Sequence, residues 1–251
     1  MQVIKDIIYG TQAPKSQILD LFLPDGDVTD LFIYFHGGGL EAGDKRDGSD
    51  TLPDYLLPLV TRYGKAVISA NYRMYPTAVF PEFVEDAASV VAWAKEHIRE
   101  YCDIQRIFVG GSSAGAWLTA MLAYAPDYLA KHGIKTTDIA GYVIDSAQMT
   151  THFNVLRERG LNTKLIRVDD AAPVYYLDEH TAFPDILVLV SDHDMPCRLE
   201  QNLMFLKTLE MLGCPAQKVT YKLLKGFTHT GYLKEGSLFP DLVAEYIDSV
   251  K

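Results

Sequence analysis

A pentapeptide, Gly111-Ser112-Ser113-Ala114-Gly115, carries the residue types that a serine nucleophile needs. It follows the apolar run 107–109 and precedes 116–123, a stretch rich in strong helix formers. Where a strand turns sharply into a helix with Gly-x-Ser-x-Gly at the bend, the middle serine is held at the tip with its hydroxyl clear of the sheet. The pattern predicts Ser113 as the nucleophile. Ser112 is the alternative, but it occupies the second position of the motif.

A second glycine-rich motif, His36-Gly37-Gly38-Gly39, follows the apolar run 31–35. Glycines leave the backbone N–H groups without side-chain cover, so these groups are available to an anion or a carbonyl oxygen. We therefore expect the backbone N–H groups of Gly38, Gly39 and Ala114 to form an oxyanion hole. A flexible loop is the alternative interpretation of the glycines alone.

A serine nucleophile also needs a base and a carboxylate that orients the base. His229 is the one candidate histidine after the last predicted strand, and turn residues frame it. Asp192 and Asp194 both follow the apolar strand 185–190 closely. We favour Asp194 as the acid because it stands just before Met195-Pro196, where the loop should turn. Asp192 is then expected to cap that turn.

The elements that must position these residues alternate along the chain. Apolar runs predict strands over 3–9, 18–23, 31–35, 65–71, 107–109, 140–144, 185–190 and 219–224, and helical spacing predicts helices over 52–63, from Pro81, over 116–123, over 198–212 and from Pro240. Such alternation requires a mostly parallel sheet of about eight strands with helices on both faces. Because loops at the carboxyl ends of parallel strands line the ligand crevice, the four motif-bearing loops should meet there.

The chain shows no linker, repeat or low-complexity tract, which predicts one α/β domain over residues 1–251. The stretch 146–182 is the least regular. It is interpreted as a small lid or pocket wall, with a crossover helix and loop as the alternative. In the helix over 198–212, four leucines fall on one face. Asp145 and Gln148, after the strand over 140–144, either edge the pocket or form a turn.

Composition narrows the possible partners. The formal net charge of −10 argues against nucleic acid, because phosphate binding needs a basic face. No apolar run approaches the ~20 residues of a membrane helix, and the N-terminus lacks the layout of a secretory signal, so a cytoplasmic protein is expected. Three unclustered cysteines predict neither a disulfide framework nor a metal site, and no histidine pair has ligand spacing. No metal or cofactor is expected.

Taken together, the two glycine motifs, Asp194 and His229 resemble the α/β-hydrolase esterases related to hormone-sensitive lipase, and still more their compact bacterial acetylesterase and feruloyl-esterase-like relatives. The segment 71–86, with Asn71-Tyr72-Arg73 and Phe80-Pro81, is similar as well. The resemblance covers about residues 31–232. Only about thirty residues precede the strand before the glycines, so the helical cap of larger members is expected to be absent. Leu40 replaces the aromatic residue that often follows the glycines.

The resemblance implies an α/β-hydrolase fold without a large cap domain and a serine carboxylesterase that needs no cofactor. The expected substrate is a small-molecule ester with a short, acetyl-type acyl group, such as an acylated sugar. No membrane partner is expected. An amidase, an arylformamidase or a small peptidase with the same triad is the alternative, followed by a non-catalytic binding module. The sequence leaves the substrate-binding residues and the oligomeric state open, a homodimer included.

Overall fold

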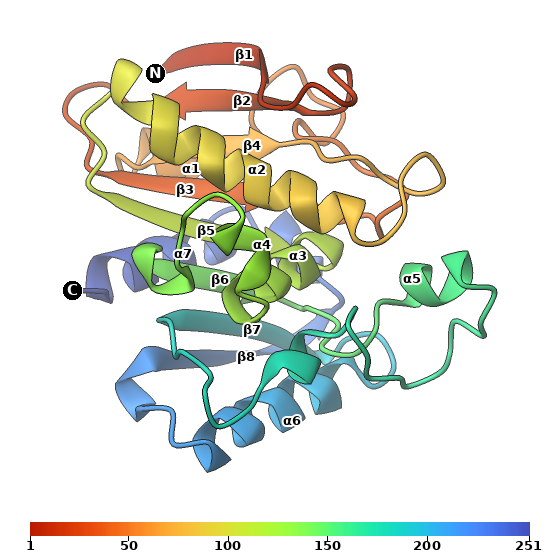
Figure 1. Cartoon of the computed structure of the whole chain (residues 1–251). Helices are drawn as coiled ribbons and strands as arrows, with labels where there is room; N and C mark the ends of the chain where they lie inside the picture. The colour runs from red at the N-terminus through yellow and green to blue at the C-terminus, as the bar shows by residue number, and fades with distance from the viewer.

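An eight-stranded sheet forms the centre of the computed structural model, which describes residues 1–251 (Figure 1). Its strands are β1 (Gln2–Ile8), β2 (Ile18–Leu23), β3 (Asp30–Phe35), β4 (Ala66–Ala70), β5 (Arg106–Ser112), β6 (Gly141–Asp145), β7 (Ile186–His193) and β8 (Val219–Thr228). They lie in the order β1-β2-β4-β3-β5-β6-β7-β8. The pairs β1–β2 and β2–β4 are antiparallel, and all the others are parallel. The predicted fold class is therefore confirmed.

Helices cover both faces of this sheet. The α-helices are α1 (Leu57–Thr61), α2 (Glu82–His97), α3 (Ala114–Tyr124), α4 (Asp127–Ala130), α5 (Phe153–Glu158), α6 (Arg198–Met211) and α7 (Leu238–Ser249). Short 3₁₀ turns are η1 (Ile98–Glu100), η2 (Thr136–Asp138), η3 (Pro173–Tyr176), η4 (Ala216–Lys218) and η5 (Gly231–Lys234). The helices α2, α3 and α6 bury one apolar layer against the sheet, and α1 and α7 bury a second layer on the other face (Figure 1).

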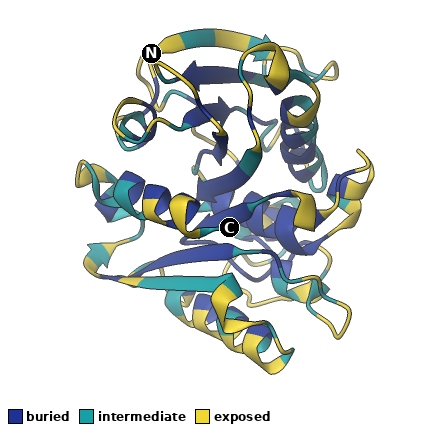
Figure 2. Cartoon of the chain, turned by 90° about the vertical axis from the view of Figure 1, so that its left-hand side faces the viewer, coloured by how far each residue is buried: buried dark blue, intermediate teal, exposed yellow.

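The central strands are mostly apolar because both of their faces are covered. Every residue of β3, β4 and β6 is buried, whereas the edge strands β1 and β8 carry exposed residues (Figure 2). The same double coverage explains why these strands show continuous apolar runs rather than alternation. No helix in this fold combines the length and the hydropathy that crossing a bilayer takes.

Several strands extend beyond their apolar runs, into segments that the sequence interpretation assigned to loops. β5 continues to Ser112, and β7 and β8 continue to His193 and Thr228, which pair with each other beyond a register shift. Backbone pairing with a neighbouring strand extends them, and hydropathy does not report such pairing. Conversely, the helix predicted over 52–63 is a helix only over Leu57–Thr61, with Pro58 in its first turn.

The buried face of α6 differs from the leucine face that its sequence suggests. Leu203 is 41% exposed, while the polar side chains of Arg198, Gln201 and Asn202 are buried. Asn202 Nδ2 donates to Ala147 O, and Gln201 Oε1 accepts from Met149 N. The inward face of the first part of α6 is therefore polar because it binds the backbone of the loop that follows β6, while Phe205 and Leu209 further along the helix are buried in the apolar core.

Candidate active site

The bend between β5 and α3 places Ser113 at the tip of a sharp turn. Ser113 has φ +57° and ψ −112°, a conformation that an L-residue keeps only when its surroundings hold it. A Cβ added to Gly115 would lie 1.9 Å from Phe35 O, and one added to Gly111 would lie 2.5 Å from Gly115 C. The motif glycines are thus required by the close passage of β3, β5 and α3.

A continuous hydrogen-bond relay joins Ser113, His229 and Asp194. Ser113 Oγ lies 2.8 Å from His229 Nε2, and His229 Nδ1 lies 2.6 Å from Asp194 Oδ1. These residues follow β5, β8 and β7, so the carboxyl ends of parallel strands bring them together. An ionised carboxylate only accepts hydrogen bonds; His229 Nδ1–H therefore donates to Asp194, and Nε2 is left to accept from the Ser113 hydroxyl.

The electrostatics of Asp194 suit an orienting carboxylate. Its side chain is only 1% exposed, and this burial raises its pKa. The hydrogen bond and charge of His229 together with the Met195 N–H outweigh the burial, so the pKa of Asp194 lies below its ordinary value. Asp194 is consequently ionised at neutral pH.

The two alternative residues make other contacts. Asp192 Oδ1 accepts from the backbone N–H of Gly226 at 2.7 Å, so it joins β7 to β8 rather than capping the turn at Met195-Pro196. The Ser112 hydroxyl donates to Asp145 and accepts from Tyr34 O–H at 3.0 Å. Neither side chain makes a hydrogen bond to His229.

Three backbone N–H groups stand available near Ser113. Gly38 and Gly39 have positive φ values of +107° and +66°, and their N–H groups donate to no acceptor in the protein. Ala114 is the first residue of α3, so its N–H lacks an intrahelical partner. Gly38 and Gly39 line the same cavity as Ser113. Gly38 and Gly39 therefore face the space beside Ser113, whereas Ala114 is buried and is not among the residues that line the cavity.

The glycine-rich loop is held from both sides. The His36 ring stacks on Tyr72 at 4.5 Å between centroids, and His36 Nδ1 donates to Gly37 O at 2.7 Å. From α5, Asn154 Nδ2 donates to Gly39 O at 2.9 Å. The sequence interpretation missed Asn154, because it lies in the irregular stretch 146–182 and no motif marks it.

Replacing Asn154 with alanine should lower the turnover of ester substrates about tenfold while KM stays within about twofold. The loss of its hydrogen bond frees the Gly39 carbonyl, which loosens a donor-bearing loop that matters most in the transition state. The measurement is steady-state kinetics with p-nitrophenyl acetate. Asn162→Ala in the same segment is the matched control, since its exposed side chain contacts only Lys164 N; equal effects of both variants would contradict this role.

Ser113 and His229 open onto a cavity of about 340 Å³. Its lining comprises Tyr34, Gly37, Gly38, Gly39, Glu41, Tyr55, Ser112, Ser113, Phe153, Met195, His229, Thr230 and Leu233. Phe153, from α5, places its ring against Gly39, where an added Cβ would lie 2.8 Å from it. The stretch 146–182 therefore contributes to the cavity wall through α5.

A second hollow of about 350 Å³ adjoins this cavity, with Tyr55 and Leu233 lining both. Its other lining residues are mostly charged or hydroxylated and include Arg46, Asp47 and Lys234. Tyr55 and Leu233 thus line both the cavity at Ser113 and a neighbouring polar depression.

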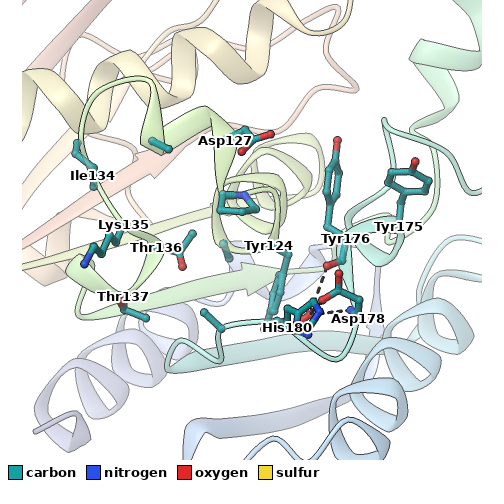
Figure 3. A pocket seen from close by; sticks show the side chains of 15 residues that line it. Tyr124, Asp127, Ile134, Lys135, Thr136, Thr137, Tyr175, Tyr176, Asp178 and His180 are labelled. Carbon is teal, nitrogen blue, oxygen red and sulfur yellow. Dashed lines mark hydrogen bonds between the residues drawn. The ribbon is translucent and has the colours of Figure 1, made fainter.

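A larger hollow than the Ser113 cavity lies elsewhere in the molecule, and Figure 3 shows the side chains that line it. It measures about 850 Å³ and is formed by the end of α3, by α4 and η2, and by the segment with Tyr175, Tyr176 and Asp178. None of Ser113, Asp194 and His229 lines it. Its size alone does not mark it as the reactive site, because the relay lies at the smaller cavity.

The other residues that the sequence singled out as possible pocket residues, Asp145 and Gln148, lie outside the Ser113 cavity. Asp145 is fully buried and Gln148 is 7% exposed. Gln148 donates to the backbone carbonyl of Thr151 instead. No three His, Cys, Asp or Glu side chains converge in a way that could hold a metal ion, and all three cysteines are free thiols.

This architecture defines the class of the protein. A mostly parallel eight-stranded sheet, with a serine elbow after β5 and a histidine after the last strand, is the α/β-hydrolase fold. The model of the BD-FAE family matches residues 19–209, more than half of the chain. The chain belongs to the BD-FAE family. The matched residues include Ser113 and Asp194, whereas His229 lies beyond them.

Curated relatives share shorter segments with this chain. Esterase LipI of Mycobacterium tuberculosis is 34% identical over 101 residues, which are 40% of this chain and 30% of that protein. Carboxylic ester hydrolase LipN of the same organism is 38% identical over 100 residues, 39% of this chain and 25% of that protein. The chain thus spans less than a third of the length of either relative.

Similarity to solved structures extends over nearly the whole chain. A truncated carbohydrate esterase from gut microbiota superposes with a TM-score of 0.78 at 18% identity and covers 99% of this chain and 96% of its own. At that identity the likeness concerns the fold.

Proposed function

We propose that this protein is a serine esterase that hydrolyses carboxylic esters through an acyl-enzyme on Ser113. The observation that carries the proposal is the unbroken relay from Ser113 Oγ through His229 to Asp194 beside N–H groups that have no protein acceptor. The names of the curated relatives LipI and LipN, an esterase and a carboxylic ester hydrolase, support it.

In the acylation step, His229 Nε2 removes the Ser113 hydroxyl proton as Oγ attacks the ester carbonyl carbon. The carbonyl oxygen becomes an oxyanion, which accepts hydrogen bonds from the N–H groups of Gly38, Gly39 and Ala114. Asp194 stabilises the imidazolium that His229 has become. The imidazolium then protonates the leaving alkoxide, the ester bond breaks, and the alcohol departs.

In the deacylation step, His229 removes a proton from water, and the resulting hydroxide attacks the carbonyl carbon of the acyl-enzyme. The same N–H groups bind the second oxyanion. Collapse of that intermediate breaks the bond to Ser113 Oγ, which regains its proton from His229, and the carboxylic acid is released.

We propose short, acetyl-type acyl groups as substrates, carried on a hydroxyl-rich alcohol such as a sugar. The cavity at Ser113 measures only about 340 Å³, and Phe153 closes against its glycine loop. The adjoining depression past Tyr55 offers charged and hydroxyl groups, which suit a polyhydroxylated leaving group better than a lipid chain. The carbohydrate esterase with the same fold agrees with this choice.

The deciding experiment measures kcat/KM for p-nitrophenyl esters of two, four and eight carbons, for a peracetylated monosaccharide and for the matched anilide p-nitroacetanilide. We expect the two-carbon ester to exceed the eight-carbon ester at least about tenfold, acetate release from the sugar, and little turnover of the anilide. Faster turnover of the anilide than of the acetate would replace the proposal with an amidase. A preference for eight carbons would overturn the short-acyl assignment.

A further inference from the structure

A buried carboxylate lies directly beneath the elbow, outside the relay already described. Asp145 is the last residue of β6. It has a relative exposure of 0% and does not line the Ser113 cavity. It pairs in register with Ser112, the residue before the nucleophile. No Lys, Arg or His side chain forms an ion pair with it.

Three hydrogen bonds connect Asp145 to the segments that carry Ser113 and His229. Its backbone carbonyl accepts from Ser113 N at 2.8 Å. One carboxylate oxygen, Oδ2, accepts from the Ser112 hydroxyl, and the other, Oδ1, accepts from the Tyr232 hydroxyl. Tyr232 belongs to η5, which begins two residues after His229.

We propose that Asp145 is a positioning residue that ties the serine elbow to the histidine loop, with Ser112 and Tyr232 as its two hydrogen-bonding arms. The inference rests on the proposed function, because the role given to these three residues is to maintain the distance between Ser113 Oγ and His229 Nε2. Asp145 touches neither reacting atom and acts through the backbone of both loops.

Stability alone is a poor explanation for a carboxylate at this position. Burying a carboxyl group that has no cationic partner costs free energy that apolar side chains of similar volume would not cost. Burial raises the pKa of Asp145 to about 8, with the nearby Asp194 acting in the same direction and the hydrogen bond from Ser112 opposing it. The carboxyl group is therefore retained at a cost, and its two oxygens supply the two hydrogen-bonding atoms that a link between two hydroxyl groups requires.

Backbone strain on both sides of Asp145 shows why the elbow needs support. Ser113 on the neighbouring strand end and Ser146, the residue after Asp145, both have φ +57°. Residues in such a conformation are strained and persist only where the surrounding contacts determine them. Ser146 is also held by Arg198, which donates to its carbonyl oxygen from α6. The contacts of Asp145 hold the first of these strained positions.

Replacing Asp145 itself would leave two buried hydroxyls unpaired, so the test uses its partners. Ser112→Ala and Tyr232→Phe each remove one hydroxyl with little change of shape. We expect each variant to lower kcat for p-nitrophenyl acetate about tenfold with KM within about twofold, because a displaced base affects the transition state more than binding. The double variant should be little slower than either single one, since breaking either arm breaks the same link.

Tyr142→Phe is the matched control, because it removes a buried hydroxyl from the same strand that bonds only Thr136 O, away from the site. It should lower the melting temperature as the test variants do, yet leave kcat unchanged. Unchanged kcat in Ser112→Ala and Tyr232→Phe, or a double variant whose loss is the product of the single losses, would overturn the inference. Absence of ester hydrolysis by the wild-type protein would instead overturn the proposed function.

Discussion

Substituting Ser113 with alanine is expected to lower kcat for p-nitrophenyl acetate by at least about 10⁴-fold. Alanine removes the one hydroxyl that lies 2.8 Å from His229 Nε2, so no acyl-enzyme can form. Residual hydrolysis would come from the oxyanion donors and from substrate binding alone. The melting temperature should change by only about 3 °C, because alanine and serine meet the same backbone strain at φ +57°.

A fluorophosphonate probe provides the second measurement for Ser113. The wild-type protein should be labelled at Ser113 as Oγ displaces fluoride from phosphorus, with a mass increase of one probe less HF, and Ser113→Ala should not be labelled. Ser112→Ala is the neighbouring comparison and should still be labelled, although more slowly. Labelling of Ser112, or retention of activity in Ser113→Ala, would refute the assigned nucleophile; an unlabelled wild-type protein would favour a non-catalytic binding module.

Those features that depend on local chemistry could be predicted from the sequence. The alternation of apolar runs and helical spacing indicated the sheet, and the pentapeptide indicated a bend between β5 and α3. Chain order then placed an aspartate and a histidine at the same end of the sheet as Ser113, because parallel strands point the same way. The structure brings Ser113, Asp194 and His229 within hydrogen-bonding distance.

The missed residues are those whose positions depend on long-range packing. Asn154 contacts Gly39, which is 115 residues away in the chain, and Tyr232 contacts Asp145 across 87 residues. In α6, Leu203 is exposed and Asn202 is buried, because the facing surface is the backbone of a loop rather than apolar side chains. Hydropathy patterns describe what a residue prefers, whereas these burials depend on what the partner segment presents.

The competing aspartates lead to the second large effect. Asp194→Asn should lower kcat about 10³–10⁴-fold, since an amide can present its NH₂ group to His229 and stabilise the wrong tautomer, and it cannot stabilise the imidazolium. The pKa of Asp194 lies below its ordinary value, so the wild-type carboxylate keeps its charge throughout the range in which esterases are assayed. The loss in the variant should therefore persist from about pH 6 to about pH 9.

Asp192→Asn separates this role from a merely structural one. Asp192 Oδ1 accepts from Gly226 N, and the carboxamide oxygen of asparagine can accept the same hydrogen bond. Its kcat should stay within about twofold of the wild-type value, although it removes a negative charge two residues from Asp194. A large loss in Asp192→Asn together with a small loss in Asp194→Asn would exchange the two assignments. Comparable losses in both would mean that the charge of the β7 loop, rather than the hydrogen bond to His229, supports the base.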